Sequence, residues 1–337
     1  MEPRAPRVGI KDVAKAAGVS VGTVSHVLNR PEMVSERRRA AVLTAIEELG
    51  YVPNHAARQL KAGSSRLIGY LFPNPGNPYF AALNQGIIRE AERLDLFVMS
   101  ATSMGDYERR RHYLSLFEQQ RARGIIVSPK HSDVSAELAV SRRGTPVVLA
   151  SAPDPTGSLC SVASDDFAVG LLACEHLYEL GRRKILLVAP GGQVSSEERC
   201  RGFEETARER GMEVRLAPVA DASIDAGCRI AEGILDGPAD QRPDAIFCTS
   251  DMLAIGVLQV LVSDNRLQVP ADIAVMGCDD LEFSDSTIIP LTSVRQHEDR
   301  MGQMAVQLLE EELTAPDHVH SSVLIPPVLM ARASTLG

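Results

Sequence analysis

The sequence has no long hydrophobic run, because no window approaches the roughly 20 consecutive apolar residues that span a bilayer. Its first stretch, MEPRAPRVG, contains no apolar segment of the signal-peptide kind, so we expect a cytoplasmic protein. Hydrophobic residues make up 45% and charged residues 23% of the 337 positions, which are ordinary values for a globular protein. This length suffices for two or three domains.

Closely spaced cysteines are also absent. The six cysteines form no CxxC pair, and Cys160 and Cys174, the closest two, lie fourteen positions apart. Several lie in apolar runs such as AIFCTS and VMGCDD, which indicates buried thiols in place of disulfides or zinc ligands. Of the eight histidines only His318 and His320 are close, and their polar surroundings indicate a solvated pair. We therefore expect no metal site and no cofactor.

The motifs of several enzyme classes are missing, namely G-x-S-x-G, the P-loop, H-E-x-x-H and a G-x-G-x-x-G between a strand and a helix. Two pairs of adjacent carboxylates remain, Asp165–Asp166 and Asp279–Asp280. Such neighbours more often divide between a helix cap and a solvent or ligand contact than act as an acid–base pair. We predict that the protein is not an enzyme and has no catalytic residues.

Positive charge is scarce overall but is concentrated at the N-terminal end. The formal net charge is −9, yet residues 1–62 carry ten Lys and Arg against six Asp and Glu, so the remainder carries −13. A basic head on an acidic body is typical of a DNA-binding head with a separate domain.

The stretch from Ile10 to Asn29, IKDVAKAAGVSVGTVSHVLN, predicts two short helices joined by a tight turn. Asp12 suits the positive end of the first helix dipole, Gly18 suits the left-handed residue that ends this helix, and Ser20 offers an N-cap for the second. This spacing is that of a helix-turn-helix, whose second helix enters the major groove of DNA.

A third helix is expected from about Ser35 to Leu49, ending at Gly50. Its apolar stripe, Val42, Leu43, Ile46 and Leu49, would complete a three-helix core. Arg37, Arg38 and Arg39 lie near its start, where they either approach phosphates or form a solvated charged face.

From residue 66 onward, strands and helices alternate in two series, which predicts two lobes, each a doubly wound parallel sheet with helices on both faces. Ligands of such lobes bind at the carboxyl ends of strands, in the cleft between lobes. The expected strands are 67–72, 96–101, 124–128, 146–150, 184–188, 213–216, 245–248 and 273–276. The expected helices are 78–94, 107–120, 134–143, 167–180, 196–210, 224–235, 252–264 and 303–313, and the tail PPVLMARASTLG is read as a strand and a short coil.

Several motifs in order carry a resemblance to a known family: DVAKAAGVSVGTVSHVLN, then Val34-Ser35, LGYVPN and ARQL. The chain resembles the LacI-family (lac repressor-like) transcriptional regulators, and the resemblance extends to a periplasmic-binding-protein-like body. It implies a head at 1–62 with a hinge helix at about 54–61, and an effector-binding and dimerisation domain at 63–337. Lobe 1 would comprise about 66–163 and 295–323, and lobe 2 about 164–293 and 324–337.

The resemblance also implies the DNA-contacting residues. Val21, Gly22 and His26 would face the bases, and Thr23, Ser25 and Asn29 would lie near the backbone. The hinge residues Asn54, Ala57 and Leu60 would enter the minor groove, with Leu60 as an apolar wedge. Arg is usual where His26 stands, and Gly22 has no side chain, so we expect few direct base contacts.

Four fragments carry the implied effector site: NPYF, the segment from Ser195 to Phe203, TSD and MGCDD. In this reading Asp279 accepts hydrogen bonds from ligand hydroxyls, although a helix N-cap is the alternative role for it. The other implied site residues are Tyr79, Phe80, Ser195, Arg199, Ser250 and Gln296. Many relatives carry Asn where Ser250 stands, and aromatics seen in some relatives are missing around 221–225.

The leading hypothesis is a homodimeric transcriptional repressor that binds a palindromic double-stranded DNA operator and responds to a sugar or sugar derivative. Whether the effector releases the protein or acts as a corepressor stays open. A sugar-binding module with a degenerate DNA head is the alternative, and a sugar-modifying enzyme on the same lobes is a third.

Overall fold

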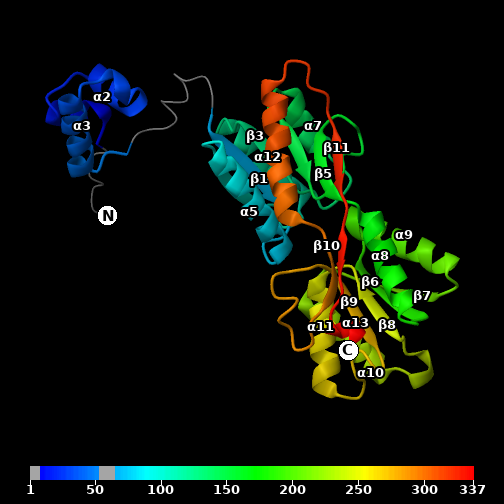
Figure 1. The fold of residues 1–337 in the computed structure, drawn as a ribbon. Coiled ribbons are helices and arrows are strands. Elements are labelled where there is room, and N and C mark those ends of the chain that lie inside the picture. The colour runs from blue at the N-terminus through cyan, green and yellow to red at the C-terminus, as the bar shows by residue number, and fades with distance from the viewer. Residues whose placement is uncertain (1–7, 53–64) are drawn as a thin grey trace. The chain divides into compact units, whose positions relative to one another are not determined.

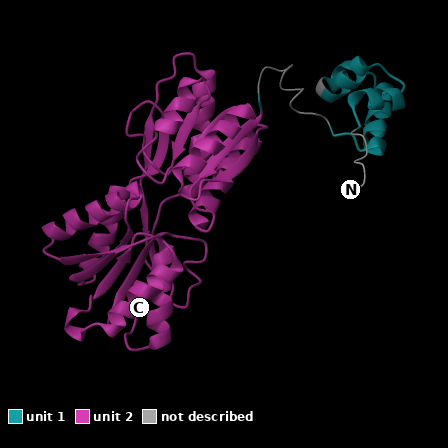
Figure 2. Cartoon of the chain, turned by 180° about the vertical axis from the view of Figure 1, so that it is seen from behind, with its two compact units in different colours: residues 1–65 teal, residues 66–337 magenta. Residues whose placement is uncertain are grey.

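The chain divides into two compact units, residues 1–65 and residues 66–337 (Figure 2). The structure is a computed structural model, and it describes residues 8–52 and 65–337. The predicted hinge helix, with Asn54, Ala57 and Leu60, lies outside the described residues. In the described part of the chain, no helix is long and apolar enough to cross a membrane.

The N-terminal unit is a three-helix bundle, as the sequence predicts. Its helices are α1 (Ile10–Ala16), α2 (Val21–Asn29) and α3 (Glu36–Leu49), with a short 3-10 turn, η1 (Pro31–Met33). The Ser20 hydroxyl accepts the Thr23 N–H at 3.1 Å and so caps α2. Gly18 has φ +61°, so the turn between α1 and α2 uses the left-handed conformation that glycine adopts without strain.

The core of this unit is small and apolar. Its buried members are Val13, Ala14, Val24, Val27, Val42 and Ala45. The prediction for Leu43 is wrong, because its side chain is 48% exposed. At 100° per residue, positions 42, 45, 46 and 49 share one side of α3 and position 43 turns away from it, so Ala45 takes the inward place.

The C-terminal unit contains two six-stranded sheets (Figure 1). We call the first sheet with its helices lobe 1. Its strand order is β11-β5-β4-β3-β1-β2, and all neighbours are parallel. Helices α5 and α12 pack on one face, and α6 and α7 pack on the other. The bounds are β1 (Leu67–Phe72), α5 (Pro78–Arg93), β2 (Phe97–Thr102), α6 (Tyr107–Gln119), β3 (Gly124–Val127), α7 (Ser135–Arg142), β4 (Val147–Ala150), β5 (Cys160–Ser164), α12 (Glu298–Thr314) and β11 (Ser322–Ile325).

The second sheet with its helices is lobe 2. Its order is β12-β10-β9-β8-β6-β7, and only β12 runs antiparallel to its neighbour. Helices α8 and α9 cover one face, and α10 and α11 cover the other. The bounds are α8 (Asp166–Glu179), β6 (Lys184–Pro190), α9 (Val194–Glu209), β7 (Glu213–Val219), α10 (Ile224–Asp236), η2 (Ala239–Gln241), β8 (Ala245–Cys248), α11 (Asp251–Asp264), β9 (Ala274–Asp279), β10 (Thr292–Arg295), β12 (Val328–Met330) and α13 (Ala333–Leu336).

The chain passes between the two sheets three times, after β5, after β10 and after β11 (Figure 1). The sequence reading missed the strands β5, β10 and β11, which are four or five residues long and rich in Ser. It also placed the start of α12 at Gln303, whereas the helix begins at Glu298. Gly302 interrupts the apolar pattern there, yet it is required because a Cβ on it would lie 2.2 Å from the Leu83 carbonyl oxygen of α5.

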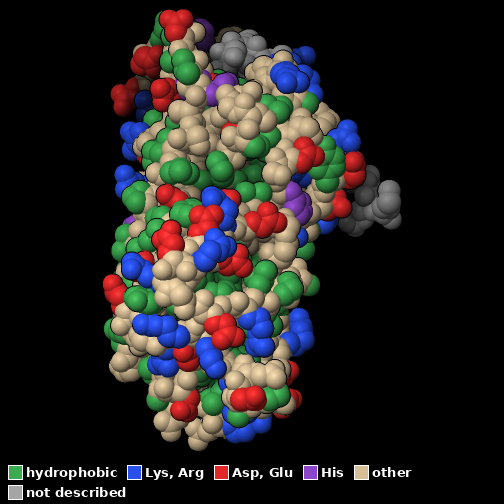
Figure 3. Space-filling view, turned by 90° about the vertical axis from the view of Figure 1, so that its right-hand side faces the viewer, with side chains coloured by type: hydrophobic (Ala, Val, Ile, Leu, Met, Phe, Trp, Pro, Cys, Tyr) green, Lys and Arg blue, Asp and Glu red, His purple; other side chains and the backbone are tan. Residues whose placement is uncertain are grey.

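Charges of both signs are interspersed among the described side chains on the face seen in Figure 3. A face of this kind suits solubility, and it offers a polyanion no continuous basic surface.

Candidate functional site

Helix α2 has one buried and one exposed side. Val24 and Val27 are buried in the core, whereas Val21, Gly22 and His26 are exposed. Side chains on the exposed side of such a helix are the ones available to a major groove.

The residues predicted to lie near the DNA backbone differ from these in exposure. Thr23 and Ser25 are half-buried, and the Thr23 hydroxyl lies 3.0 Å from the Ser20 hydroxyl that caps α2. The Asn29 side chain lies outside the described set. Arg37, Arg38 and Arg39 are all exposed in the first turns of α3, which is compatible with a phosphate contact and with a solvated face alike.

A cavity of about 250 Å³ lies where the carboxyl ends of the strands of both lobes meet. Parallel strands end at one edge of each sheet. At these edges, the lobe 1 loops after β1, β3 and β4 line the cavity together with the lobe 2 loops after β6, β7, β8 and β9. The lining comprises Pro73, Asn74, Asn77, Tyr79, Phe80, Met104, Gly105, Pro129, Lys130, Ser151, Gln193, Ser195, Ser196, Arg199, Asp221, Ala222, Thr249, Ser250 and Asp279.

The apolar wall of the cavity comes from the start of α5. Asn77 caps this helix by accepting the Tyr79 N–H at 3.0 Å, which fixes the two aromatic residues that follow. Tyr79 and Phe80 pack edge to face with ring centroids 5.2 Å apart. Tyr79 is 6% exposed and its hydroxyl faces the Met301 sulfur at 3.9 Å, so it serves more as a fixed wall than as a hydrogen-bonding group.

The polar wall is a buried network around Arg199. Its Nε donates to Asp166 Oδ1 at 2.7 Å, its Nη1 to the Thr249 carbonyl at 2.6 Å and its Nη2 to Gln296 Oε1 at 2.7 Å. Asp279 Oδ1 lies 3.8 Å from Nη1. A guanidinium has five N–H donors, so two remain after these three hydrogen bonds to described residues, and Arg199 lines the cavity.

Asp279 is held by two side-chain donors. Ser250 Oγ donates to its Oδ2 at 3.1 Å, and Gln296 Nε2 donates to its Oδ1 at 2.7 Å. Burial raises the pKa of the Asp279 carboxyl well above its usual range, and the Arg199 charge opposes this shift. A carboxylate has about four lone-pair positions, so Asp279 keeps acceptor capacity for a ligand.

Backbone geometry at the end of β9 is strained. Asp279 has φ +126° and Asp280 has φ +54°, in the region that disfavours residues with a Cβ. Strain of this kind persists where the surroundings hold it, and it is frequent at ligand sites. The alternative role of Asp279 as a helix N-cap is wrong, because no helix begins after it: β9 is followed by β10, and the next helix, α12, begins at Glu298.

The two carboxylate pairs meet the expectation only in part. Asp165 caps α8 as predicted, with its Oδ1 accepting the Ala168 N–H at 2.9 Å. Its neighbour Asp166 contacts neither solvent nor cavity but pairs with Arg199. Asp280 is likewise buried, with Arg295 Nε at 2.7 Å and Arg332 Nη2 at 2.6 Å.

Arg199 reaches this network because α8 and α9 cross very closely. A Cβ on Gly170 of α8 would lie 2.0 Å from the Arg199 carbonyl oxygen, and one on Gly202 of α9 would lie 2.1 Å from the Phe167 carbonyl oxygen. Both glycines therefore let the backbones touch, and this contact sets the height of Arg199 above the sheet.

Of the seven predicted effector residues, six line the cavity: Tyr79, Phe80, Ser195, Arg199, Ser250 and Asp279. Gln296 lies behind them, 1% exposed, and bridges Arg199 and Asp279. The sequence reading missed Asp166 as the partner of Arg199, and it missed Lys130 and Asp221 in the lining. Lys130 follows the apolar strand β3, so the rule that ligands bind after strands would have found it.

The lobes also touch at the mouth of this cavity. His131, in the loop after β3, places its Nδ1 2.6 Å from the Gly192 carbonyl oxygen, in the loop after β6. Leu281 and Met252 of lobe 2 also join the lobes, because they pack against the lobe 1 core.

A further expectation fails away from the cavity. The pair His318 and His320 is not solvated on its own, because both rings pack against the buried Cys160. The sequence could not show this contact, since Cys160 lies 158 positions before His318.

A helix-turn-helix unit joined to two sheet lobes with a polar cavity at their strand ends defines a class: DNA-binding regulators with a small-molecule-binding body. Comparison with known proteins narrows the class. The family described as bacterial regulatory proteins, lacI family, matches residues 9–54, and the periplasmic binding protein-like domain matches residues 174–335.

The chain is 31% identical over 334 residues to the HTH-type transcriptional repressor PurR of Aliivibrio fischeri strain MJ11, covering 97% of this chain and 98% of that protein. It is 30% identical over 329 residues to the ribose operon repressor of Escherichia coli strain K12, covering 96% and 99%. The crystal structure of the Lac repressor dimer bound to operator and the anti-inducer ONPF matches with TM-score 0.85 and 29% identity, covering 98% of this chain and 100% of that one. The chain belongs to the LacI family of DNA-binding transcriptional regulators, and the relatives named here are repressors, not enzymes.

Proposed function

We propose that the protein represses transcription as a homodimer on a palindromic operator, and that a sugar or sugar derivative bound between the lobes sets its DNA affinity. The observation that carries the proposal is the pairing of Arg199 with Asp279 in the cavity. One offers only donors and the other only acceptors, and a polyol satisfies both through its hydroxyl groups.

The size and walls of the cavity support a small ligand. A volume of about 250 Å³ falls just below the roughly 300–1,000 Å³ of pockets for drug-sized molecules. The aromatic wall of Tyr79 and Phe80 offers an apolar surface to one face of a sugar ring. One relative is named the ribose operon repressor, which supports a sugar, and purines stay in the test as the competing class.

In the proposed mechanism the ligand bridges groups from both lobes and changes the angle between them. Tyr79 and Phe80 belong to lobe 1, whereas Arg199, Ser250 and Asp279 belong to lobe 2. A ligand shifts this equilibrium only by its difference in affinity for the two lobe arrangements. Measuring DNA affinity with and without the ligand decides whether the ligand acts as an inducer or as a corepressor.

The test is a thermal-shift screen of residues 66–337 against sugars, sugar phosphates, polyols, nucleosides and purines. A ligand at about 100 times its Kd should add roughly 2.7 kcal/mol of stability. The shift should vanish in Asp279→Asn and persist in Asp240→Asn, an exposed carboxylate of lobe 2 outside the lining. A shift from purines alone, or a sugar shift that survives Asp279→Asn, would contradict the proposal.

DNA binding is tested separately with the full chain. Selection from random duplexes should yield a palindromic site, and its affinity should fall steeply with salt as counterions are released. Adding the stabilising compound should change that affinity. A chain that binds sugar but selects no duplex would favour the alternative, a sugar-binding module with a degenerate head.

A further inference from the structure

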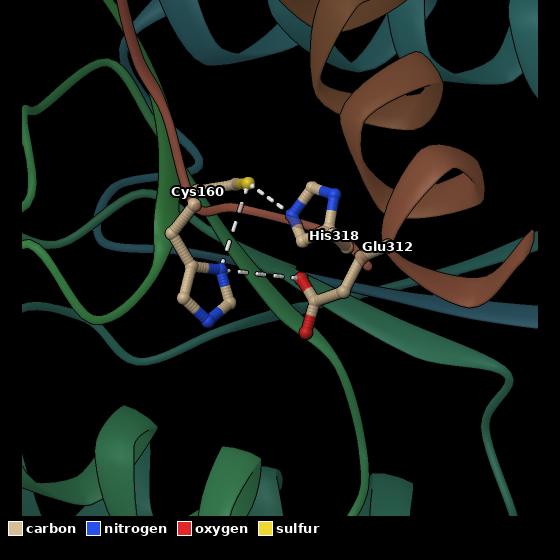
Figure 4. A group of neighbouring side chains, drawn as sticks. Cys160, Glu312 and His318 are labelled. Atoms are coloured by element: carbon tan, nitrogen blue, oxygen red, sulfur yellow. Dashed lines mark hydrogen bonds and ion pairs between the residues drawn. The ribbon is translucent and has the colours of Figure 1, made fainter. Parts of the chain in front are cut away.

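Four side chains with metal-ligating atoms converge in lobe 1, well away from the cavity (Figure 4). They are Cys160, Glu312, His318 and His320, and one ligand atom of each lies within 4.8 Å of the others. Cys160 is the first residue of β5 and Glu312 lies in the last turn of α12. Both histidines lie in the loop between α12 and β11.

The distances suit one small ion at the centre. Cys160 Sγ lies 3.1 Å from His318 Nε2 and 3.7 Å from His320 Nδ1, and His320 Nδ1 lies 4.0 Å from Glu312 Oε2. A tetrahedral zinc ion, with bonds of about 2.3 Å to sulfur and about 2.0 Å to nitrogen or oxygen, separates its ligands by roughly 3.3–3.6 Å. These three spacings bracket this range and all four ligand atoms lie within 4.8 Å of one another, so side-chain rotations that move the atoms by up to about one ångström would complete the geometry.

The hydrogen bonds within the cluster do not satisfy all of its polar atoms. A thiol donates one weak hydrogen bond, so the Cys160 sulfur can donate to only one of the two imidazole nitrogens beside it and is a weak acceptor for the other. Glu312 Oε2 is buried and has no hydrogen-bond partner among the described residues. Lone pairs that converge in a buried place without enough donors are costly, and a cation at their centre removes that cost.

The donor set selects the metal. A thiolate, an imidazole and a carboxylate each bind zinc, and zinc takes four ligands, whereas magnesium and calcium prefer oxygen ligands alone. We propose that Cys160, Glu312, His318 and His320 bind one Zn²⁺ ion per chain. On binding, the Cys160 sulfur exchanges its proton for the metal, and the proton passes to solvent.

The site is distinct from the effector cavity. Cys160 begins β5, and its neighbours in the parallel sheet also begin at this edge, whereas the cavity lies beyond the strand ends. β1 begins at the same edge with Leu67, close to where the chain enters the lobe. The ion would tie the end of α12 and the loop before β11 to β5.

The test uses the untagged full chain, stripped with a chelator and titrated with Zn²⁺ or with Co²⁺ as a spectroscopic substitute. We expect one Co²⁺ per chain, tetrahedral visible absorption, a thiolate-to-cobalt charge-transfer band, and displacement by Zn²⁺. Cys160→Ser should abolish the charge-transfer band, and His318→Gln should weaken binding at least about tenfold.

Matched controls are Cys228→Ser, a half-buried thiol in α10, and His112→Gln, an exposed imidazole in α6. Both should bind the ion as the unmodified chain does. Should Cys160→Ser fail to fold, His320→Gln, whose side chain is 31% exposed, replaces it and should weaken binding likewise. Substoichiometric binding, or a band that survives Cys160→Ser, would overturn the proposal, and neither result depends on DNA or effector binding.

Discussion

At the scale of single residues, the cavity is governed by buried charges that balance one another. Arg199 carries one positive charge, and Asp166 and Asp279 flank it on two sides. Removing one member of a buried charged network leaves the others without compensation, so each residue acts through its partners. Asp166 does not line the cavity, and its contribution is to position Arg199.

The variant Asp166→Asn tests whether Asp166 positions Arg199, and Asp165→Asn is the control. The neutral amide still accepts a hydrogen bond but no longer balances Arg199, so the guanidinium should move toward Asp279 and occupy acceptors that the ligand needs. We expect the compound that stabilises the chain most in the screen to bind about tenfold or more weakly by calorimetry. Asp165→Asn, which changes only the cap of α8, should leave ligand affinity unchanged; an equal loss in both variants would refute the positioning role.

Glu298 should make stability depend on pH. Burial raises the pKa of its carboxyl from 4.5 to about 8, so the folded chain keeps a proton that the unfolded chain releases. Stability from this group is therefore complete below about pH 4.5 and is lost as the pH rises through about 8. Glu298→Gln should raise the free energy of unfolding at pH 8.5 by roughly 1–4 kcal/mol and change it little at pH 5.

The measurement is urea denaturation at both pH values, with Glu311→Gln as the control on the same helix. Glu311 is exposed, so its variant should follow the unmodified chain at pH 5 and pH 8.5. A Glu298→Gln chain that loses stability between pH 5 and 8.5 as steeply as the unmodified one would refute the assignment.

At the scale of elements, pairs of glycines decide how closely helices cross. Gly170 of α8 and Gly202 of α9 each lie against the backbone of the other helix. Glycines of the pairs α5–α12 and α10–α11 approach the partner helix as closely. In each case an added Cβ would lie within 2.2 Å of a carbonyl oxygen of the other helix. Since backbone cannot yield as a flexible side chain does, these crossings constrain the sheet-covering helices of both lobes.

Gly170→Ala and Gly233→Ala form a matched pair of helical substitutions. A Cβ added to Gly170 would clash with the Arg199 carbonyl oxygen, so this replacement should destabilise the chain by about 1–3 kcal/mol and weaken ligand binding. An added Cβ on Gly233 meets nothing within 4 Å, so this change should stabilise the chain by about 0.4–1 kcal/mol. Thermal unfolding decides between them, and a neutral Gly170→Ala would mean that α8 and α9 separate easily.

At the scale of the whole molecule, DNA recognition and ligand recognition lie in separate compact units. Residues 1–65 hold the helix-turn-helix and residues 66–337 hold both lobes. Each unit has its own buried core, so each should fold without the other. In the proposed mechanism, regulation depends on the connection between the units and on the pairing of two chains.

Residues 66–337 alone should therefore keep the thermal shift caused by the ligand and lose the salt-dependent affinity for the selected operator. Fluorescence anisotropy with labelled duplex at two salt concentrations measures the second property. Persistent specific DNA binding by this fragment would place a DNA-contacting surface on the body and would contradict the separation of the two functions.

Much of the fold follows from local sequence. The head was predicted because caps, turn glycines and apolar spacing act within a few residues, as at Gly18 and Ser20. The alternation of strands and helices in the body was predicted for the same reason. Short Ser-rich strands such as β5 were missed, since their burial depends on neighbours and not on their own composition.

The sequence by itself therefore determined the helix-turn-helix, the two-lobed α/β architecture and the residue types at the strand ends. Only the tertiary structure decided which side chains meet. Arg199 contacts Asp166 33 positions before it and Gln296 97 positions after it, and Cys160 contacts His318 158 positions after it. The physical reason is that strand order differs from chain order, as three crossings between the lobes place β11 beside β5, and no local hydrogen bond or periodicity records such contacts.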